Sequence, residues 1–177
     1  MTKKSDTELE TGTTYLIKEA KPYLSTKLFQ SVVRSGIPGL TVTRLYPEKL
    51  EDEYEIEGDD IRSIWLSRSV GEDIIDPVKI GPLAMEIESF INEHESSIIL
   101  LEGIEYLTLV NGFDVVHRFL EYIHERIVGS DSILIVSVSP NAFEEREMAL
   151  LERNKEIIDM PLITFSEGSA LLDLLHQ

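Results

Sequence analysis

Ser97-Ile-Ile-Leu-Leu-Glu102 and Ser132-Ile-Leu-Ile-Val-Ser-Val138 are two short runs in which most residues are apolar. A strand with one face in water alternates apolar and polar residues, whereas a strand of a parallel sheet covered by helices on both faces is apolar throughout. Between the two runs, apolar residues recur every three or four positions, at Phe113, Val116, Leu120, Ile123 and Ile127. Strands that alternate with helices predict an α/β fold, with a mostly parallel sheet between two helical layers.

The same patterns extend over the rest of the chain. Strands are predicted over residues 13–19, 39–44, 61–67, 97–102, 132–138 and 161–165. Helices are predicted over residues 22–35, 113–127, 168–175, from Asp76-Pro77 to His94, and from Ser139-Pro140 to Arg153, where an Asp or Ser cap precedes a first-turn proline. We therefore expect one three-layer domain over residues 13–177, after a flexible tail over residues 1–12.

Composition excludes several classes of protein. The 177 residues include no cysteine, so there is no disulfide framework and no cysteine zinc site. Lys and Arg total 16 and Asp and Glu total 33, and the net charge of −17 argues against binding to nucleic acid or anionic lipid. No stretch is typical of a signal peptide or a membrane span, so we expect a cytoplasmic protein.

The acidic charge is concentrated in residues 51–60, which contain seven acids and no base. The simpler interpretation is a solvated loop that keeps the protein soluble. The alternatives are a docking surface for a basic protein partner and a divalent-ion site, although the D-x-[DN]-x-[DN]-G spacing of a calcium loop is missing.

The segment between the first strand and the first helix is where a phosphate-binding loop, G-x-x-x-x-G-K-[ST], would lie. In that frame the chain has Ala20, Ser25, Thr26 and Lys27, so both glycines are missing and threonine replaces the lysine. Side chains at the glycine positions hinder the tight turn, and Pro22 removes one amide donor. We expect no working phosphate loop.

Glu102 ends an apolar strand, as does the acid that holds Mg²⁺ or positions water in many nucleotide hydrolases. Together with Lys27 and Arg44 near the same sheet edge, it allows a second hypothesis, a nucleotide-binding protein or slow NTPase with a degenerate phosphate site. Without a phosphate loop, a hydrogen-bond role for Glu102 in fixing a loop is the simpler interpretation.

His117, Glu121 and His124 are spaced i, i+4 and i+7, so they share one face of the predicted helix. Two imidazoles and a carboxylate can hold a divalent metal ion, which gives a third hypothesis, a metal-dependent enzyme. The alternative is that the two histidines lie at the edge of the buried helix face and have ordinary packing roles. No G-x-S-x-G, H-E-x-x-H or G-x-G-x-x-G motif is present, and no catalytic residue is assigned.

An ordered set of short motifs runs through most of the chain. They are Gly12-Thr-Thr-Tyr15, Gly39-Leu-Thr-Val-Thr-Arg44-Leu-Tyr-Pro47, Trp65-Leu-Ser67, Leu101-Glu-Gly-Ile-Glu-Tyr-Leu107, Asn111-Gly-Phe113, Val138-Ser-Pro140 and Leu150-Leu-Glu152. Over about residues 12–155 this set resembles the archaeal domain of unknown function 835. The resemblance implies a RecA/KaiC-type ATPase core that has lost its phosphate loop, in a family often attached to sensory regions.

The resemblance brings no established activity, so its motif positions are only candidates for ligand or partner binding: Arg44, Trp65, Glu102, Tyr106 and Asn111. Asn111 also suits the cap of the helix over 113–127. The leading expectation is a non-catalytic RecA-like regulatory or protein-interaction module of archaeal signalling type, without a cofactor. Self-association through sheet edges and helices is a further expectation, as is a protein partner.

Overall fold

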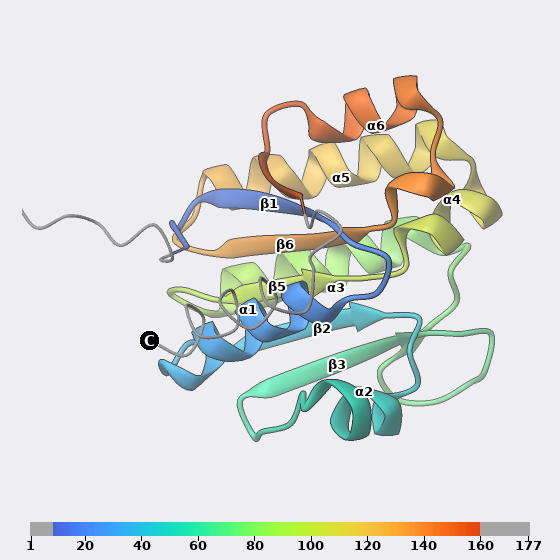
Figure 1. Cartoon of the computed structure of the whole chain (residues 1–177). Helices are drawn as coiled ribbons and strands as arrows, with labels where there is room; N and C mark the ends of the chain where they lie inside the picture. The colour runs from blue at the N-terminus through green and yellow to red at the C-terminus, as the bar shows by residue number, and fades with distance from the viewer. Residues whose placement is uncertain (1–8, 160–177) are drawn as a thin grey trace, which may run out of the picture.

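The computed structural model describes residues 9–159, which form a seven-stranded, wholly parallel sheet (Figure 1). In spatial order the strands are β4 (Ile74–Ile75), β3 (Ile61–Leu66), β2 (Gly39–Thr43), β5 (Ile98–Leu101), β6 (Ile133–Val138), β1 (Thr13–Lys18) and β7 (Glu156–Asp159). The two apolar runs, β5 and β6, are neighbours at the centre of the sheet, and every residue in both strands is buried. The predicted α/β class is confirmed.

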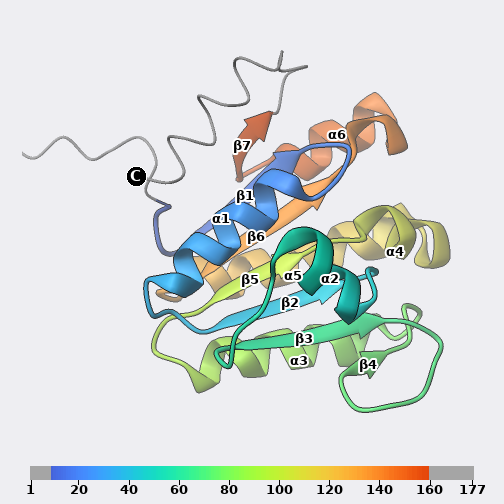
Figure 2. The same ribbon diagram turned by 60° about the horizontal axis from the view of Figure 1, so that its bottom comes forward.

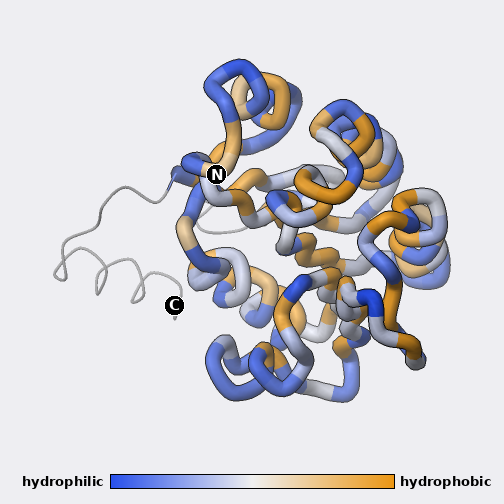
Figure 3. The backbone as a smooth tube through the Cα atoms, turned by 90° about the vertical axis from the view of Figure 1, so that its right-hand side faces the viewer, coloured by the Kyte–Doolittle hydropathy of each residue, from blue (hydrophilic) through white to orange (hydrophobic). Residues whose placement is uncertain are grey.

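Helices cover both faces of the sheet and make three layers. Helices α1 (Tyr23–Arg34) and α2 (Pro47–Tyr54) pack on one face, where Ile17, Ile98 and Leu100 lie. Helices α3 (Ile80–Glu93), α4 (Ile104–Asn111), α5 (Phe113–Val128) and α6 (Glu145–Glu152) lie on the other. Figure 2 shows α1 and α2 in front of the sheet with α3 and α5 behind it. Figure 3 shows hydrophobic strand residues between these helical layers.

The acidic segment is partly helical, where the sequence predicted a loop. Pro47 lies at the first turn of α2, and Leu50 and Tyr54, four residues apart, are buried against α1 and the sheet. The acids between these two residues are exposed. The helix was missed because an apolar face of only two residues is hard to recognise in so acidic a segment.

Two predicted helix starts were wrong, and a further helix was missed. Asp76 makes a turn by accepting hydrogen bonds from Val78 and Lys79, and α3 begins only at Ile80. Ser139-Pro140 starts a short 3₁₀ turn, and α6 begins after Glu144, whose backbone N–H donates to the Glu147 side chain. Helix α4 was not predicted, since its apolar residues continue those of β5 without a visible break.

The short edge strands β4 and β7 were also missed, and the strand predicted over 161–165 and the helix predicted over 168–175 lie outside the described residues. Part of the predicted tail is held in place, because the Gly12 amide donates to the Ser132 carbonyl at 2.7 Å. The domain bounds 13–177 stay a prediction. Among residues 9–159, no helix has the length and apolarity needed to cross a membrane.

Gly39 begins β2 directly beneath α1, and we predict that Gly39→Ala destabilises the protein. A Cβ at this position would lie 2.5 Å from Phe29 Cζ and 2.8 Å from Val33 Cγ2, both in the buried core. Overpacking of this kind lowers the free energy of unfolding by about 1–3 kcal/mol, which urea unfolding would measure. Gly81→Ala is the control, because nothing lies within 4 Å of a Cβ there. Equal stability of both variants and the wild type would contradict the packing described here.

Candidate functional site

The carboxyl ends of the parallel strands meet at one edge of the sheet, which we call the carboxyl edge. Glu19 follows β1, Arg44 follows β2, Glu102 follows β5 and Ser139 follows β6. Ligands of open parallel sheets bind outside this edge. The sequence predicted most of its candidates from these positions, and the structure shows how each is held.

Glu19 lies at the position of the missing phosphate loop. Its carboxylate accepts hydrogen bonds from the backbone N–H groups of Leu24, at 2.8 Å, and Ser25, at 3.4 Å, in the first turns of α1. The Ser137 hydroxyl on β6 donates to the same carboxylate at 2.8 Å. Amides at a helix N-terminus are the groups that bind phosphate in a phosphate loop. Here an internal carboxylate takes the place of the phosphate.

The Glu19 side chain is buried, with 7% of its surface exposed. Burial raises the pKa of this carboxyl above its ordinary value, and the hydrogen bonds from the α1 turn and from Ser137 oppose that rise. The role of Glu19 was missed from the sequence. The available signal was an acid between a buried strand and a helix that lacks the glycines of a phosphate loop.

Other residues of the phosphate-loop frame also bind within the protein. The Thr26 hydroxyl donates to the Pro22 carbonyl at 2.6 Å, and Lys27 Nζ lies 3.7 Å from a Glu55 carboxylate oxygen. Lys27 therefore faces α2 and its acidic residues.

Glu102 fixes a loop, although not the one that follows its own strand. One carboxylate oxygen accepts the Thr43 hydroxyl at 2.7 Å and the Arg44 backbone N–H at 3.2 Å. Glu102 thereby holds the chain where it leaves β2. No hydrogen bond or ion pair joins Glu102 to Lys27 in the described part of the chain.

Arg44 is the centre of a cluster that joins three of the predicted candidates. Its guanidinium carbon lies 3.3 Å from the centre of the Tyr106 ring, and its carbonyl accepts the Trp65 indole N–H at 3.2 Å. Tyr46 packs edge-on against Trp65, with ring centres 5.1 Å apart. Arg44, Tyr46, Trp65 and Tyr106 are named here the Arg44 cluster.

Asn111 belongs to a different part of the molecule. Its side-chain N–H groups donate to the carbonyls of Pro77 and Leu107, both at 2.9 Å, which ties the segment before α3 to α4. Asn111 is the last residue of α4, and Gly112 rather than Asn111 occupies the N-cap position of α5, so the predicted cap role of Asn111 was wrong.

Glu105 is a second half-buried acid that the sequence did not identify as important. It accepts the Ser139 backbone N–H at 2.5 Å, which links α4 to the end of β6. Burial raises the pKa of Glu105, and the hydrogen bond from Ser139 opposes that rise.

The three predicted metal ligands do not converge on one point, because Glu121 pairs with Lys155 and His117 while His124 contacts Thr14. A Glu121 carboxylate oxygen lies 3.0 Å from Lys155 Nζ and 3.7 Å from His117 Nε2, while His124 Nδ1 is 2.9 Å from the Thr14 hydroxyl. Lys155 has no exposed side-chain surface. Its ammonium group supplies the positive charge beside Glu121. Within residues 9–159, no group of three or more His, Asp and Glu side chains is placed to hold a metal ion.

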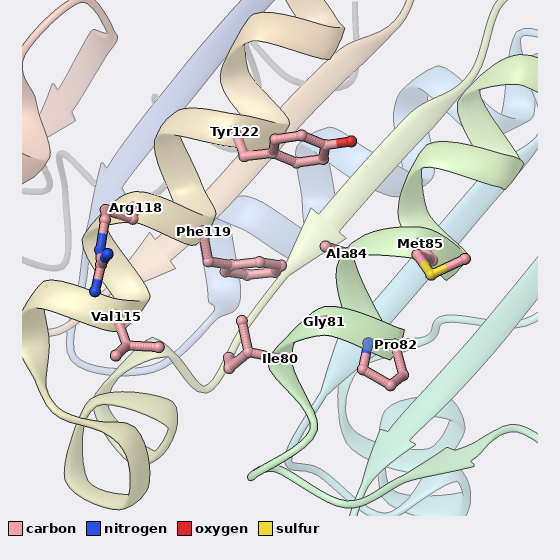
Figure 4. Close-up of a pocket in the computed structure, with 9 residues that line it drawn as sticks. All are labelled: Ile80, Gly81, Pro82, Ala84, Met85, Val115, Arg118, Phe119 and Tyr122. Carbon is pink, nitrogen blue, oxygen red and sulfur yellow. The ribbon is translucent and has the colours of Figure 1, made fainter.

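A shallow groove of about 550 Å³ runs between α3 and α5. Ile80, Pro82 and Met85 form one wall, and Val115 and Phe119 form the other (Figure 4). Arg118 and Tyr122 lie at its α5 side. None of the predicted site residues lines it.

Glu19 makes folding stability depend on pH in a defined direction. Because its folded-state pKa is above 4.5, the folded protein binds this proton more tightly than the unfolded chain does. Its contribution to the free energy of unfolding therefore falls as pH rises from about 4.5 through the raised pKa. Relative to Glu19→Gln, the wild type should therefore become more stable as the pH is lowered from about 7 to about 5, which urea unfolding would measure. A stability difference that is the same at both pH values would contradict the burial of this carboxylate.

Lys155 should depress the titration of His124. Burial is the main cause of the lowered His124 pKa, and the positive charge of Lys155 lowers it further. We predict that Lys155→Met raises the His124 pKa, measured by NMR titration of the imidazole. Lys49→Met, on α2 at the opposite face of the sheet, should leave that pKa unchanged. Equal effects of the two variants would contradict the placement of Lys155.

Comparisons with known proteins agree with this architecture. The structure is similar to a KaiC-like protein from the hyperthermophilic archaeon Pyrococcus horikoshii, with a TM-score of 0.58 and 14% identity over 88% of this chain and 76% of the other. A second Pyrococcus horikoshii protein gives a TM-score of 0.60 and 16% identity over 89% of this chain and 85% of the other. The predicted RecA-like fold is thus confirmed.

No curated protein matches the chain significantly. A family model described as "Protein of unknown function (DUF835)" matches residues 18–154, which is most of the chain. That family is the one that the ordered motifs resemble. The chain therefore belongs to the DUF835 family of proteins of unknown function.

Proposed function

We propose that this protein is a non-catalytic regulatory or protein-interaction module with a RecA-like fold, of archaeal signalling type and cytoplasmic. The observation that supports it best is the Glu19 carboxylate on the Leu24 and Ser25 amides. A phosphate group would need those same two amides as donors. The Glu19 carboxylate already accepts from them, and its negative charge would repel the phosphate.

Two further contacts support the proposal. Lys27, the nearest lysine in the phosphate-loop frame, faces Glu55, and Glu102 holds the Thr43 hydroxyl and the Arg44 amide. A nucleotide hydrolase would need a lysine at the phosphates and an acid at Mg²⁺ or water. Both residue types are present at this edge, but Glu102 holds the chain after β2, and Lys27 faces an acid at the end of α2.

The partner that the charge favours is a protein with a basic patch. All eight acids of residues 47–60 are exposed, while the apolar residues of the same segment are buried. The ion pairs that these acids make with Lys49 and Lys27 are long, at 3.8 and 3.7 Å. A surface of one charge sign speeds association with the opposite sign and repels nucleic acid. A homo-oligomer that leaves this surface free is part of the same proposal.

Thermal unfolding with ATP or ADP, with and without Mg²⁺, tests the proposal. A nucleotide present at one hundred times its dissociation constant would add about 2.7 kcal/mol, or several degrees in Tm for a domain of this size. We expect no Mg²⁺-dependent rise in Tm at millimolar nucleotide. A Mg²⁺-dependent rise that Lys27→Ala or Glu102→Gln removes would contradict the proposal and support the nucleotide-binding alternative. Arg34→Ala, at the far end of α1, is the matched control for Lys27→Ala.

A further inference from the structure

The Arg44 cluster lies where the direction of the chain connections reverses. β2 and β5 are neighbours, and the chain leaves β2 through α2 toward β3 on one side. It leaves β5 through α4 and α5 toward β6 on the other side, over the opposite face of the sheet. In open parallel sheets this reversal is the place where ligands bind, outside the carboxyl ends of the two strands. Arg44 follows β2, and Tyr106 follows β5.

The backbone of Arg44 is held on three sides. Its N–H donates to Glu102, its carbonyl accepts from the Trp65 indole, and its Cβ packs closely on Gly103. Gly103 has φ +96°, and a Cβ there would lie 3.1 Å from Arg44 Cβ. Residues from the end of β3 and from the turn after β5 therefore position one arginine, and a positioned guanidinium loses little further freedom when it binds.

Within residues 9–159, the Arg44 guanidinium has no acidic partner. Its central carbon lies over the Tyr106 ring, 3.3 Å from the ring centre, and among residues 9–159 no carboxylate forms an ion pair with it, although the chain carries 33 acids. A guanidinium stacked by its face keeps its N–H groups in the plane free to donate. Those donors match the paired oxygens of a carboxylate or phosphate.

The rest of the cluster is aromatic and accessible. Tyr46 is 50% exposed and Trp65 is half-buried beside it. Such a wall suits the apolar or aromatic body of a ligand whose charged group meets Arg44. The net charge of −17 repels acidic proteins and nucleic acid, whereas a small ligand carries too few charges for that repulsion to dominate at physiological salt.

From this arrangement we infer that the Arg44 cluster binds a small aromatic or apolar oxyanion, a carboxylate or a phosphate monoester. Arg44 binds the oxyanion, Tyr106 supports the guanidinium, and Trp65 and Tyr46 contact the body of the ligand. The site differs from the phosphate-loop position that Glu19 fills, and it extends the proposed function by giving the module a ligand to sense.

Trp65 is the one tryptophan of the chain, so its fluorescence and its indole N–H resonance report on this site alone. Benzoate and phenyl phosphate, titrated without Mg²⁺ at constant ionic strength, should each change the Trp65 signals saturably. Acetate and inorganic phosphate, which lack the aromatic body, should bind more weakly. Benzylamine, of opposite charge, should give no saturable change. If benzoate binds more tightly, the preferred charged group of the ligand is a carboxylate. If phenyl phosphate binds more tightly, it is a phosphate monoester.

Arg44→Gln should weaken binding about tenfold or more, because a charge-assisted pair is lost. The affinity of Arg44→Lys for the ligand should lie between those of Arg44→Gln and the wild type. The affinity of Tyr106→Phe should stay within about twofold of the wild-type value, because the aromatic ring remains. Arg34→Gln makes the same charge change at the opposite edge of the sheet and should bind as the wild type does. Circular dichroism and thermal unfolding confirm that each variant folds.

The inference is overturned if neither benzoate nor phenyl phosphate changes the Trp65 signals saturably. It is also overturned if a folded Arg44→Gln variant binds as tightly as the wild type. These measurements use no nucleotide and no Mg²⁺, so their failure is distinct from a Mg²⁺-dependent rise in Tm with ATP, which concerns the proposed non-catalytic role.

Discussion

The carboxylate of Glu19 joins three elements that lie far apart in the sequence. It ends β1, it accepts from the amides that begin α1, and it accepts from Ser137 on β6. The first amides of any helix need acceptors, and a buried helix start without them is costly. In a phosphate-binding relative the ligand would supply that acceptor. Here the protein supplies its own, so β1, α1 and β6 are held together without a ligand.

On the other side of β1, a side chain of the protein likewise takes the place of a bound ion, and here the charge is positive. Glu121 and His124 are half-buried on α5, His124 contacts Thr14 of β1, and the ammonium of Lys155 lies beside Glu121. A metal ion would supply charge at such a place, but a lysine from the segment before β7 already does so. Both places where the sequence suggested a bound ion are therefore satisfied by side chains of the chain itself.

The Arg44 cluster is built differently. There the backbone of Arg44 is satisfied by Glu102 and Trp65, while the charged group lies over an aromatic ring and forms no ion pair within the described residues 9–159. A RecA-like sheet brings the ends of β1, β6, β5 and β2 to one edge. The same edge can therefore hold the position at β1 that Glu19 fills and the Arg44 cluster, where the guanidinium can still bind a ligand. Since a fold shared at 14–16% identity does not carry function, the residues at each strand end have to be judged separately.

Local patterns were sufficient for the strands other than the edge strands β4 and β7, and for most of the helices. The buried strands are short apolar runs, and α1, α3 and α5 each have a periodic apolar face, so neighbouring residues alone indicate them. They were insufficient where a helix buries only two residues, as α2 does with Leu50 and Tyr54, and where α4 follows β5 with no polar break. Boundaries at Asp76 and Ser139 were wrong because an aspartate or serine before a proline also starts turns.

For the candidate site, the sequence by itself determined which residue types stand at the strand ends, and that the glycines of a phosphate loop are missing. Only the tertiary structure decided which of those residues meet. Glu19 and Ser137 are 118 positions apart, Glu102 and Thr43 are 59 apart, and Trp65 and Arg44 are 21 apart. Hydrogen bonds between such residues depend on strand order and register, which parallel pairing sets over the whole chain and no short stretch of sequence encodes.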